Sequence, residues 1–268
     1  MRFGNLRSVL TIAVLALATT APASARALGW VVQPDTQLSI AVTTTTVFGT
    51  SAAQQALLSI GGASSGAVNE PVSGSPVQLG FGGGSGWTLA DAQVDPLDPV
   101  LGPISMFLRS VQARLTGGVD FHPLQWDGYN ASQSGIDLAG VSLTLDQGWV
   151  ESYFPGAGIY FFDADPLVFN LTGQLADYSA SERIHVYYDD DDVPYYWPTG
   201  IYDLWLGIDL AGLPPASFTL DSSLGPVTVT MELSGSLSLY ALVPEPGTAG
   251  LVTLGLASLA ARRRSTAG

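Results

Sequence analysis

Apolar and polar residues alternate in several stretches of the chain. The longest such stretch covers residues 226–234, and after Gly235 the alternation resumes through Leu237 and Leu239. Shorter stretches carry the apolar sets Leu38/Ile40/Val42, Val141/Leu143/Leu145, Ile184/Val186/Tyr188 and Phe218/Leu220. A two-residue period is typical of strands with one buried face, and Gly- and Pro-rich clusters between them indicate turns. The pattern predicts an all-β fold: an antiparallel β-sandwich or jelly-roll-like domain.

A helical period is weak in this central region, and its best candidates are residues 52–58 and 104–115. The Gly/Ser-rich stretch 61–86 is predicted to be a long loop rather than a linker. We prefer the loop because residues 30–60 alone would make a poor core. One acidic β-sandwich domain is therefore expected over residues 28–242.

One short sequence occurs twice. Residues 135–140 and 207–212 both read Gly-Ile-Asp-Leu-Ala-Gly, and each is followed by a strand-like segment, 142–146 or 217–221. The second copy has three additional residues in between. We interpret the repeat as a strand–turn–strand corner used twice, and chance recurrence in a chain rich in these residues is the alternative.

Composition narrows the classes of function. Residues 28–243 contain three arginines, no lysine and 22 acidic residues, so their formal charge is −19. This charge argues against nucleic acid, because phosphate binding needs a basic face. The chain has no cysteine, which excludes disulfides, thiolate catalysis and cysteine-type zinc sites.

The first 25 residues have the organisation of a secretory signal peptide. Arg2 and Arg7 precede a short apolar run, and small residues favour cleavage after Ala25 or Ala27. A membrane helix is the alternative, but the run is shorter than the ~20 residues that span a bilayer. The secretion translocon and signal peptidase are therefore expected partners.

The last 26 residues, 243–268, have a different organisation. Val243-Pro244-Glu245-Pro246 is followed by the uncharged run 247–261 and by Arg262-Arg263-Arg264. As a helix the run would reach ~22 Å, short of the ~30 Å hydrocarbon core of a bilayer. The arginines would remain cytoplasmic. A C-terminal core helix, the alternative, would not explain three arginines after a run without a polar face.

In these parts and their order, the sequence resembles a PEP-CTERM protein. The resemblance covers the last 26 residues together with the signal peptide. It implies a sorting signal read by an exosortase, an integral-membrane cysteine protease or transpeptidase, in a Gram-negative bacterium that makes exopolysaccharide. It also implies export across the inner membrane, transient anchoring through the C-terminal helix, and a final place at the cell surface or outside the cell.

Residues 185–197 combine aromatic pairs with consecutive aspartates. If 183–188 and 195–202 are strands, the aspartates form the connecting loop. These four are a candidate Ca²⁺ site: Asp189, Asp190, Asp191 and Asp192. Carboxylate oxygens suit Ca²⁺, although the spacing of a typical calcium loop is absent. The alternative is a solvated acidic tip that limits edge pairing.

The same region contains candidates for glycan stacking. They are Tyr187, Tyr195, Trp197 and Trp205, with cross-strand packing as the alternative role. Gly62, Ser64 and Gly66 match the G-x-S-x-G pattern of a catalytic serine, but the required strand and helix are not predicted around them. A flexible loop is the preferred interpretation of that match.

These observations favour an exported, non-enzymatic cell-surface or extracellular-matrix protein associated with exopolysaccharide. No catalytic residue and no cofactor are assigned, apart from the candidate Ca²⁺. The first alternative is a carbohydrate- or Ca²⁺-binding module that uses residues 185–205. The second alternative is a secreted hydrolase, whose acid–base pair would come from scattered carboxylates. Those carboxylates are Glu151, Asp163, Asp165 and Glu182.

Overall fold

The computed structural model describes residues 26–69, 76–82, 86–153, 158–189, 191–222 and 225–243. Within them the chain forms strands and no helix, and all the strand pairs are antiparallel. The expected all-β, antiparallel class is confirmed. No helix in the described part is long and apolar enough to span a membrane. The predicted signal helix and the predicted helix 247–261 lie outside the described residues.

Two long strands, β12 (Met106–Phe121) and β21 (Gly225–Val243), organise the sheet. On one side of β21 lie β1 (Arg26–Val32) and β2 (Gln37–Thr46), and on the other β19 (Pro194–Asp209) and β20 (Ala216–Ser222). On one side of β12 lies β15 (Val141–Ser152), and on the other β7 (Val77–Phe81), β8 (Trp87–Leu89) and β9 (Ala92–Val94).

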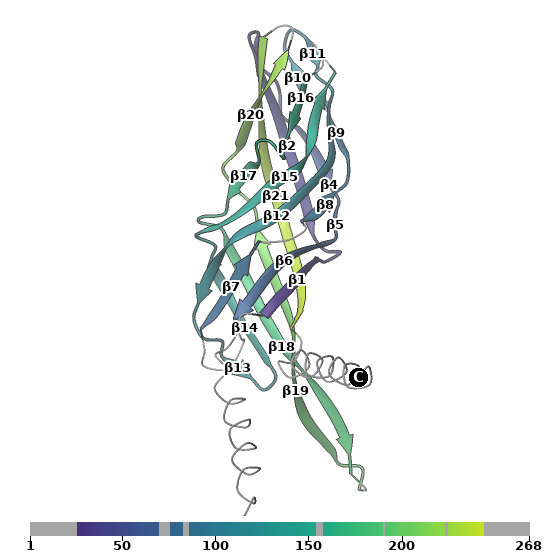
Figure 1. Cartoon of the computed structure of the whole chain (residues 1–268), viewed down its shortest axis with the longest axis vertical. Helices are drawn as coiled ribbons and strands as arrows, with labels where there is room; N and C mark the ends of the chain where they lie inside the picture. Colours follow the sequence, from purple (N-terminus) through teal and green to yellow (C-terminus); the bar gives the residue numbers. More distant parts are fainter. Residues whose placement is uncertain are drawn as a thin grey trace, which may run out of the picture.

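The remaining strands complete an elongated molecule (Figure 1). They are β3 (Gly49–Thr50), β4 (Gln54–Leu58), β5 (Ile60–Gly61), β6 (Ala63–Asn69), β13 (Trp126–Asp127), β14 (Asn130–Asp137), β16 (Gly158–Phe161), β17 (Leu167–Asn170) and β18 (Leu175–Tyr188). A separate pair consists of β10 (Leu97–Asp98) and β11 (Gly102–Pro103). The ladders connect the other 19 strands into one continuous sheet.

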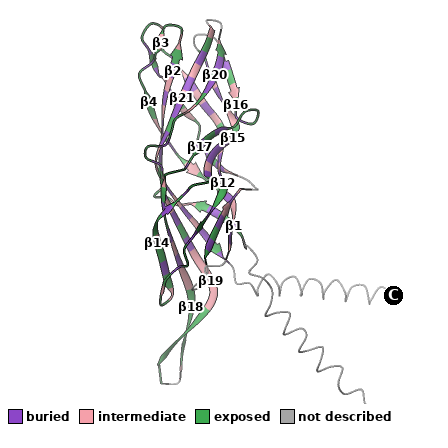
Figure 2. Ribbon diagram, turned by 90° about the vertical axis from the view of Figure 1, so that its left-hand side faces the viewer, coloured by how far each residue is buried: buried purple, intermediate pink, exposed green. Residues whose placement is uncertain are grey.

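One hydrophobic core lies on the inner face of this sheet, as the alternation of buried and exposed residues in Figure 2 shows. In β2 the buried residues are Leu38, Ile40, Val42 and Thr44, every second one as predicted. A narrow apolar gap in the core is lined both by residues of β2 and β21 and by residues of β8, β12 and β15. The two long strands and their neighbours therefore face each other across the core.

The repeated hexapeptide forms the same kind of corner twice. Its first copy joins β14 to β15, and its second joins β19 to β20. The aspartate of each copy accepts a hydrogen bond from the backbone N–H two residues later, over 3.0 Å at Asp137 and 2.9 Å at Asp209. The leucines that follow, Leu138 and Leu210, are completely buried. The two corners confirm the strand–turn–strand interpretation.

The two candidate helices are strands. Residues 54–58 form β4, and residues 104–115 lie mostly in β12. Between Met106 and Leu115 the spacing of buried residues is two except across Ser110, where the register with β15 shifts and Ser110 has φ 50°. This β-bulge adds one residue, so the local spacing becomes three and imitates a helical period.

The Gly/Ser-rich stretch 61–86 contains β6 and β7, although a loop was predicted there. Ser64 is buried in β6 opposite Trp30, so the G-x-S-x-G pattern lies on a strand rather than in a flexible loop. Small residues are needed for packing here, because a Cβ on Gly66 would lie 2.8 Å from the indole nitrogen of Trp30. The composition of this stretch therefore reflects close contact with a buried tryptophan.

Candidate functional site

The ends of β18 and β19 extend beyond the body of the molecule as a two-stranded ribbon (Figures 1 and 2). We call residues 183–198 the projecting hairpin. Its strands pair Tyr188 with Pro194, Tyr187 with Tyr195 and His185 with Trp197. The described aspartates Asp189, Asp191 and Asp192 lie in the connection between the two strands, as the sequence predicted. Ile184, Val186 and Tyr188 do alternate along a strand, but Val186 and Tyr188 remain exposed because no second layer covers the ribbon.

One face of the projecting hairpin is aromatic. Directly paired residues of an antiparallel ladder share a face, which places Tyr187, Tyr195 and Trp197 together with His185. The exposed fractions are 58% for Tyr187, 56% for Tyr195 and 69% for Trp197. Val186, Tyr188 and Tyr196 lie on the opposite face and are also exposed. Three of the four predicted stacking residues are thus brought together, and Trp205 lies further along β19.

The acidic loop is held by the first of its aspartates. The Asp189 carboxylate accepts hydrogen bonds from the backbone N–H groups of Asp191 at 3.0 Å and Val193 at 2.8 Å. These bonds hold the pKa of the Asp189 carboxyl below its usual range, and the bond from Val193 has the largest effect. Asp190 lies outside the described residues. Among the residues that are described, no group of three or more His, Asp or Glu side chains is arranged to hold a metal ion.

An ion pair supports the base of the projecting hairpin. The Arg183 guanidinium donates two hydrogen bonds to the Asp203 carboxylate, at 2.8 and 2.7 Å, and the Tyr240 hydroxyl donates a third. Arg183 lowers the pKa of Asp203 more than its partial burial raises it. Strands β18, β19 and β21 are therefore linked at the point where the ribbon leaves the body.

Replacing Asp203 by Asn should cost about 1 kcal/mol of stability at pH 7, since Arg183 is half exposed and its attraction is screened. The folded-state pKa of Asp203 is lowered, so its contribution is present above the unfolded-state value near 3.9. The contribution is lost as the pH falls through the folded-state pKa. Urea unfolding of both proteins between pH 7 and pH 3 measures this, and the difference should shrink below about pH 4. Asp35→Asn, an exposed turn substitution, is the control.

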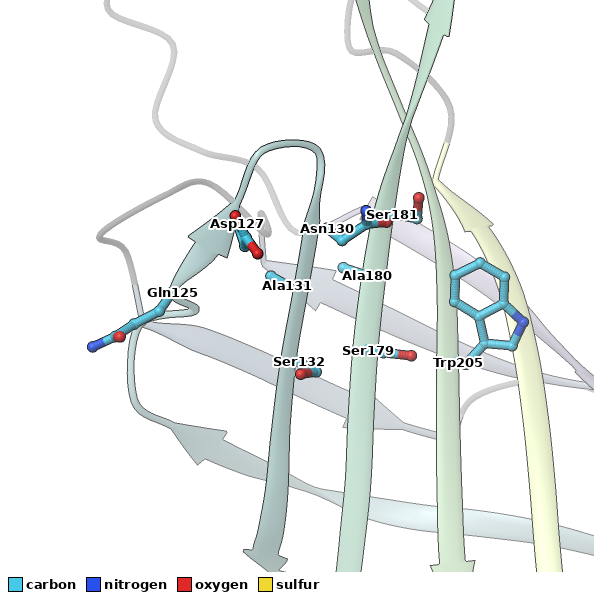
Figure 3. A pocket seen from close by; sticks show the side chains of 9 residues that line it. All are labelled: Gln125, Asp127, Asn130, Ala131, Ser132, Ser179, Ala180, Ser181 and Trp205. Atoms are coloured by element: carbon cyan, nitrogen blue, oxygen red, sulfur yellow. The ribbon is translucent and has the colours of Figure 1, made fainter.

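A shallow trough lies on the outer face of the sheet beside Trp205 (Figure 3). Its floor is made by short side chains of β14 and β18, Ser132, Ser179 and Ser181, and polar groups surround the floor. Ser132, Ser179, Trp205 and Tyr240 form one cross-strand row. Trp205 is 39% exposed, and its ring lies 5.8 Å from that of Tyr240. We call this site the Trp205 trough.

The sequence indicated Trp205 but not the rest of the trough. Gln125, Asp127 and Asn130 complete its rim, from β13, β14 and the segment before them. The sequence feature that could have indicated them is the Asp-Gly-Tyr-Asn turn at 127–130, which folds β13 back onto β14. Of the four candidate hydrolase carboxylates, Glu151 accepts a hydrogen bond from Arg109 at 3.2 Å and Glu182 accepts the Gly200 N–H at 2.9 Å.

The C-terminal motif begins at the base of the projecting hairpin. Val243, the last residue of β21, is completely buried and pairs with Tyr202. The other predicted sorting residues, Pro244 to Pro246 and Arg262 to Arg264, lie outside the described residues. The next residue in the sequence is proline, which has no N–H to continue a ladder.

Comparison with known proteins gives one match, in this C-terminal region. The family model described as PEP_exosort_dom, the PEP-CTERM protein-sorting motif, matches residues 242–264. No curated protein and no solved structure matches the chain. The match starts at the last two residues of β21 and confirms the resemblance seen in the sequence. The chain therefore carries a PEP-CTERM protein-sorting motif, which indicates an exported protein that an exosortase sorts to the cell surface.

Proposed function

We propose that this chain is a non-enzymatic component of the cell surface or extracellular matrix that binds exopolysaccharide through the aromatic face of its projecting hairpin. The observation that carries the proposal is the exposure of Tyr187, Tyr195 and Trp197 on one face of a ribbon that leaves the body. Exposed apolar side chains that adjoin one another on a surface mark an interaction site. Tyr and Trp combine an apolar ring with a polar group, so they suit the C–H faces and hydroxyls of sugars.

Calcium binding receives less support than glycan binding. A Ca²⁺ site needs several oxygen ligands directed at one centre. Asp189 instead directs its carboxylate at two backbone N–H groups of its own loop. The acidic loop acts in this proposal as a solvated cap, whose charge discourages edge-to-edge pairing of the ribbon.

Trp197→Ala should weaken binding of the full chain to the host's purified exopolysaccharide about tenfold, the equivalent of ~1.4 kcal/mol. The reason is the loss of the most exposed ring on the aromatic face. Retardation of the protein in gels containing the polysaccharide measures the effect. Tyr196→Ala is the control, because Tyr196 is also exposed but lies on the opposite face of the same ribbon. Equal retardation of wild type and Trp197→Ala would count against the proposal.

A further inference from the structure

We infer that the Trp205 trough is a second glycan-binding site, continuous with the aromatic face of the projecting hairpin. Together they form one strip for an extended polysaccharide that is uncharged or carries free amino groups. This inference rests on the proposed function and adds to it a second site and a class of ligand. The two sites share a face, the trough has the shape and the polar groups to hold a sugar, and its charge selects the class of sugar.

The two sites lie on the same face of β19. Trp205 and Trp197 are eight residues apart, an even number, and the residues on both sides of Trp205 are buried: Leu204 and Leu206. The ladder with β18 is irregular between Glu182 and Ile184, where β19 contributes two additional residues. Two residues preserve the alternation, so both tryptophans point outward. Their partners on β18, Ser179 and His185, are six residues apart, so at ~3.3 Å per residue the two tryptophans are about 20 Å apart along the ladder.

The trough has the form of a sugar-binding surface. Ser132 and Ser179 make a low floor that a flat ring can approach, and Trp205 forms one wall (Figure 3). Tyr240 packs beside Trp205 and limits its movement, so little side-chain entropy remains to be lost on binding. The rim supplies the Asn130 amide and the Asp127 carboxylate. The indole ring offers a sugar an apolar face, and the surrounding amide, carboxylate and hydroxyl groups offer it hydrogen-bond partners.

The charge of the strip excludes acidic polysaccharides. Arg183, the arginine on this strip, is already paired with Asp203, to which its Nε and Nη2 atoms donate hydrogen bonds. Within the described residues the Asp127 carboxylate has no hydrogen-bond or ion-pair partner. A uronic acid would therefore meet an uncompensated negative charge, in a domain whose formal charge is already −19. A hydroxyl can donate to Asp127, and a protonated amine can form an ion pair with it.

Three hexasaccharides test the inference on the full chain: glucosamine, N-acetylglucosamine and galacturonic acid oligomers, with calorimetry as the measurement. We expect the glucosamine hexamer to bind best and the galacturonate hexamer not to bind. Trp205→Ala should weaken binding of the uncharged N-acetylglucosamine hexamer about tenfold. That hexamer reports ring stacking without the general attraction of a cation to an acidic protein. Leu57→Ala, on the exposed face of β4, is the control for Trp205.

The role of Asp127 is tested by a pair of equal charge changes. Asp127→Asn should reduce the preference for glucosamine over N-acetylglucosamine severalfold, whereas Asp35→Asn should leave it unchanged. Equal effects of the two substitutions would overturn the assignment of Asp127. Failure of all three hexamers to bind, unchanged binding by Trp205→Ala, or strongest binding of galacturonate would overturn the trough. Retained sensitivity of exopolysaccharide binding to Trp197→Ala would then show that the proposed function stands without it.

Discussion

Replacing Gly235 by alanine should destabilise the whole domain by about 3–5 kcal/mol. Gly235 lies within β21 with φ 115°, a conformation that L residues rarely adopt. A Cβ atom at this position would also overlap the carbonyl oxygen of Gln37. The strand cannot relax easily, because the Gly235 carbonyl accepts the Leu210 N–H at 2.9 Å. Near this residue the strand paired with β21 changes on each side. On one side the partner changes from β1 to β2, and on the other side it changes from β19 to β20.

Urea unfolding of the full chain, followed by the emission of its six tryptophans, measures this effect. Gly29→Ala is the matched control. Gly29 is also in a strand, has an ordinary φ and would place its Cβ in open space. Its substitution should change stability by less than about 1 kcal/mol. An unchanged unfolding midpoint for Gly235→Ala would mean that β21 bends without needing glycine there.

Sequence alternation predicted strands well wherever one face is buried by the body. It placed β2, β15, β20 and β21 correctly, including the buried sets on each. Gly235 was expected to interrupt the last of these, but β21 continues through it to Val243. A glycine with positive φ bends a strand without ending its ladder, and the alternation alone cannot distinguish these outcomes.

Two misassignments arose where tertiary contacts determine local composition. The bulge at Ser110 shifted the apolar spacing of β12 and imitated a helix. Trp30 requires small residues opposite it, so β6 has the composition of a flexible loop. In both cases the decisive information is the identity of a partner strand distant in sequence. A single-sequence period does not contain that information.

The candidate site was predictable only where it depends on local sequence, and not where it depends on long-range strand pairing. The hairpin and its acidic loop followed from local alternation, and so did three of the stacking residues. The Trp205 trough combines side chains from β13, β14, β18 and β19, which become neighbours only through long-range pairing. Its serines also lie at ordinary outward positions of a strand, where polar residues are expected in any case. Only the structure distinguishes them from other surface serines.

Replacing Pro244, Glu245 and Pro246 together by alanine should leave the domain folded and abolish its sorting. The matched motif begins at the end of β21, and the two prolines cannot donate to a ladder with β19. We expect the missing donors to favour a motif that a membrane peptidase can reach, whereas alanines would restore the N–H donors. We expect most of the surface protein to disappear and an unprocessed, larger form to accumulate in the membrane fraction.

Immunoblots of surface and membrane fractions compare this variant with Glu232→Ala, which removes an exposed carboxylate from β21 itself. That control should be processed like the wild type, whereas replacing Arg262 to Arg264 by alanine should reproduce the sorting defect. Wild-type size and surface amount in both motif variants would contradict sorting through this motif. Because the ladder ends at Val243, the motif variants should unfold at the wild-type urea concentration. A sorting defect with unchanged stability therefore assigns the effect to recognition of the motif and not to misfolding of the domain.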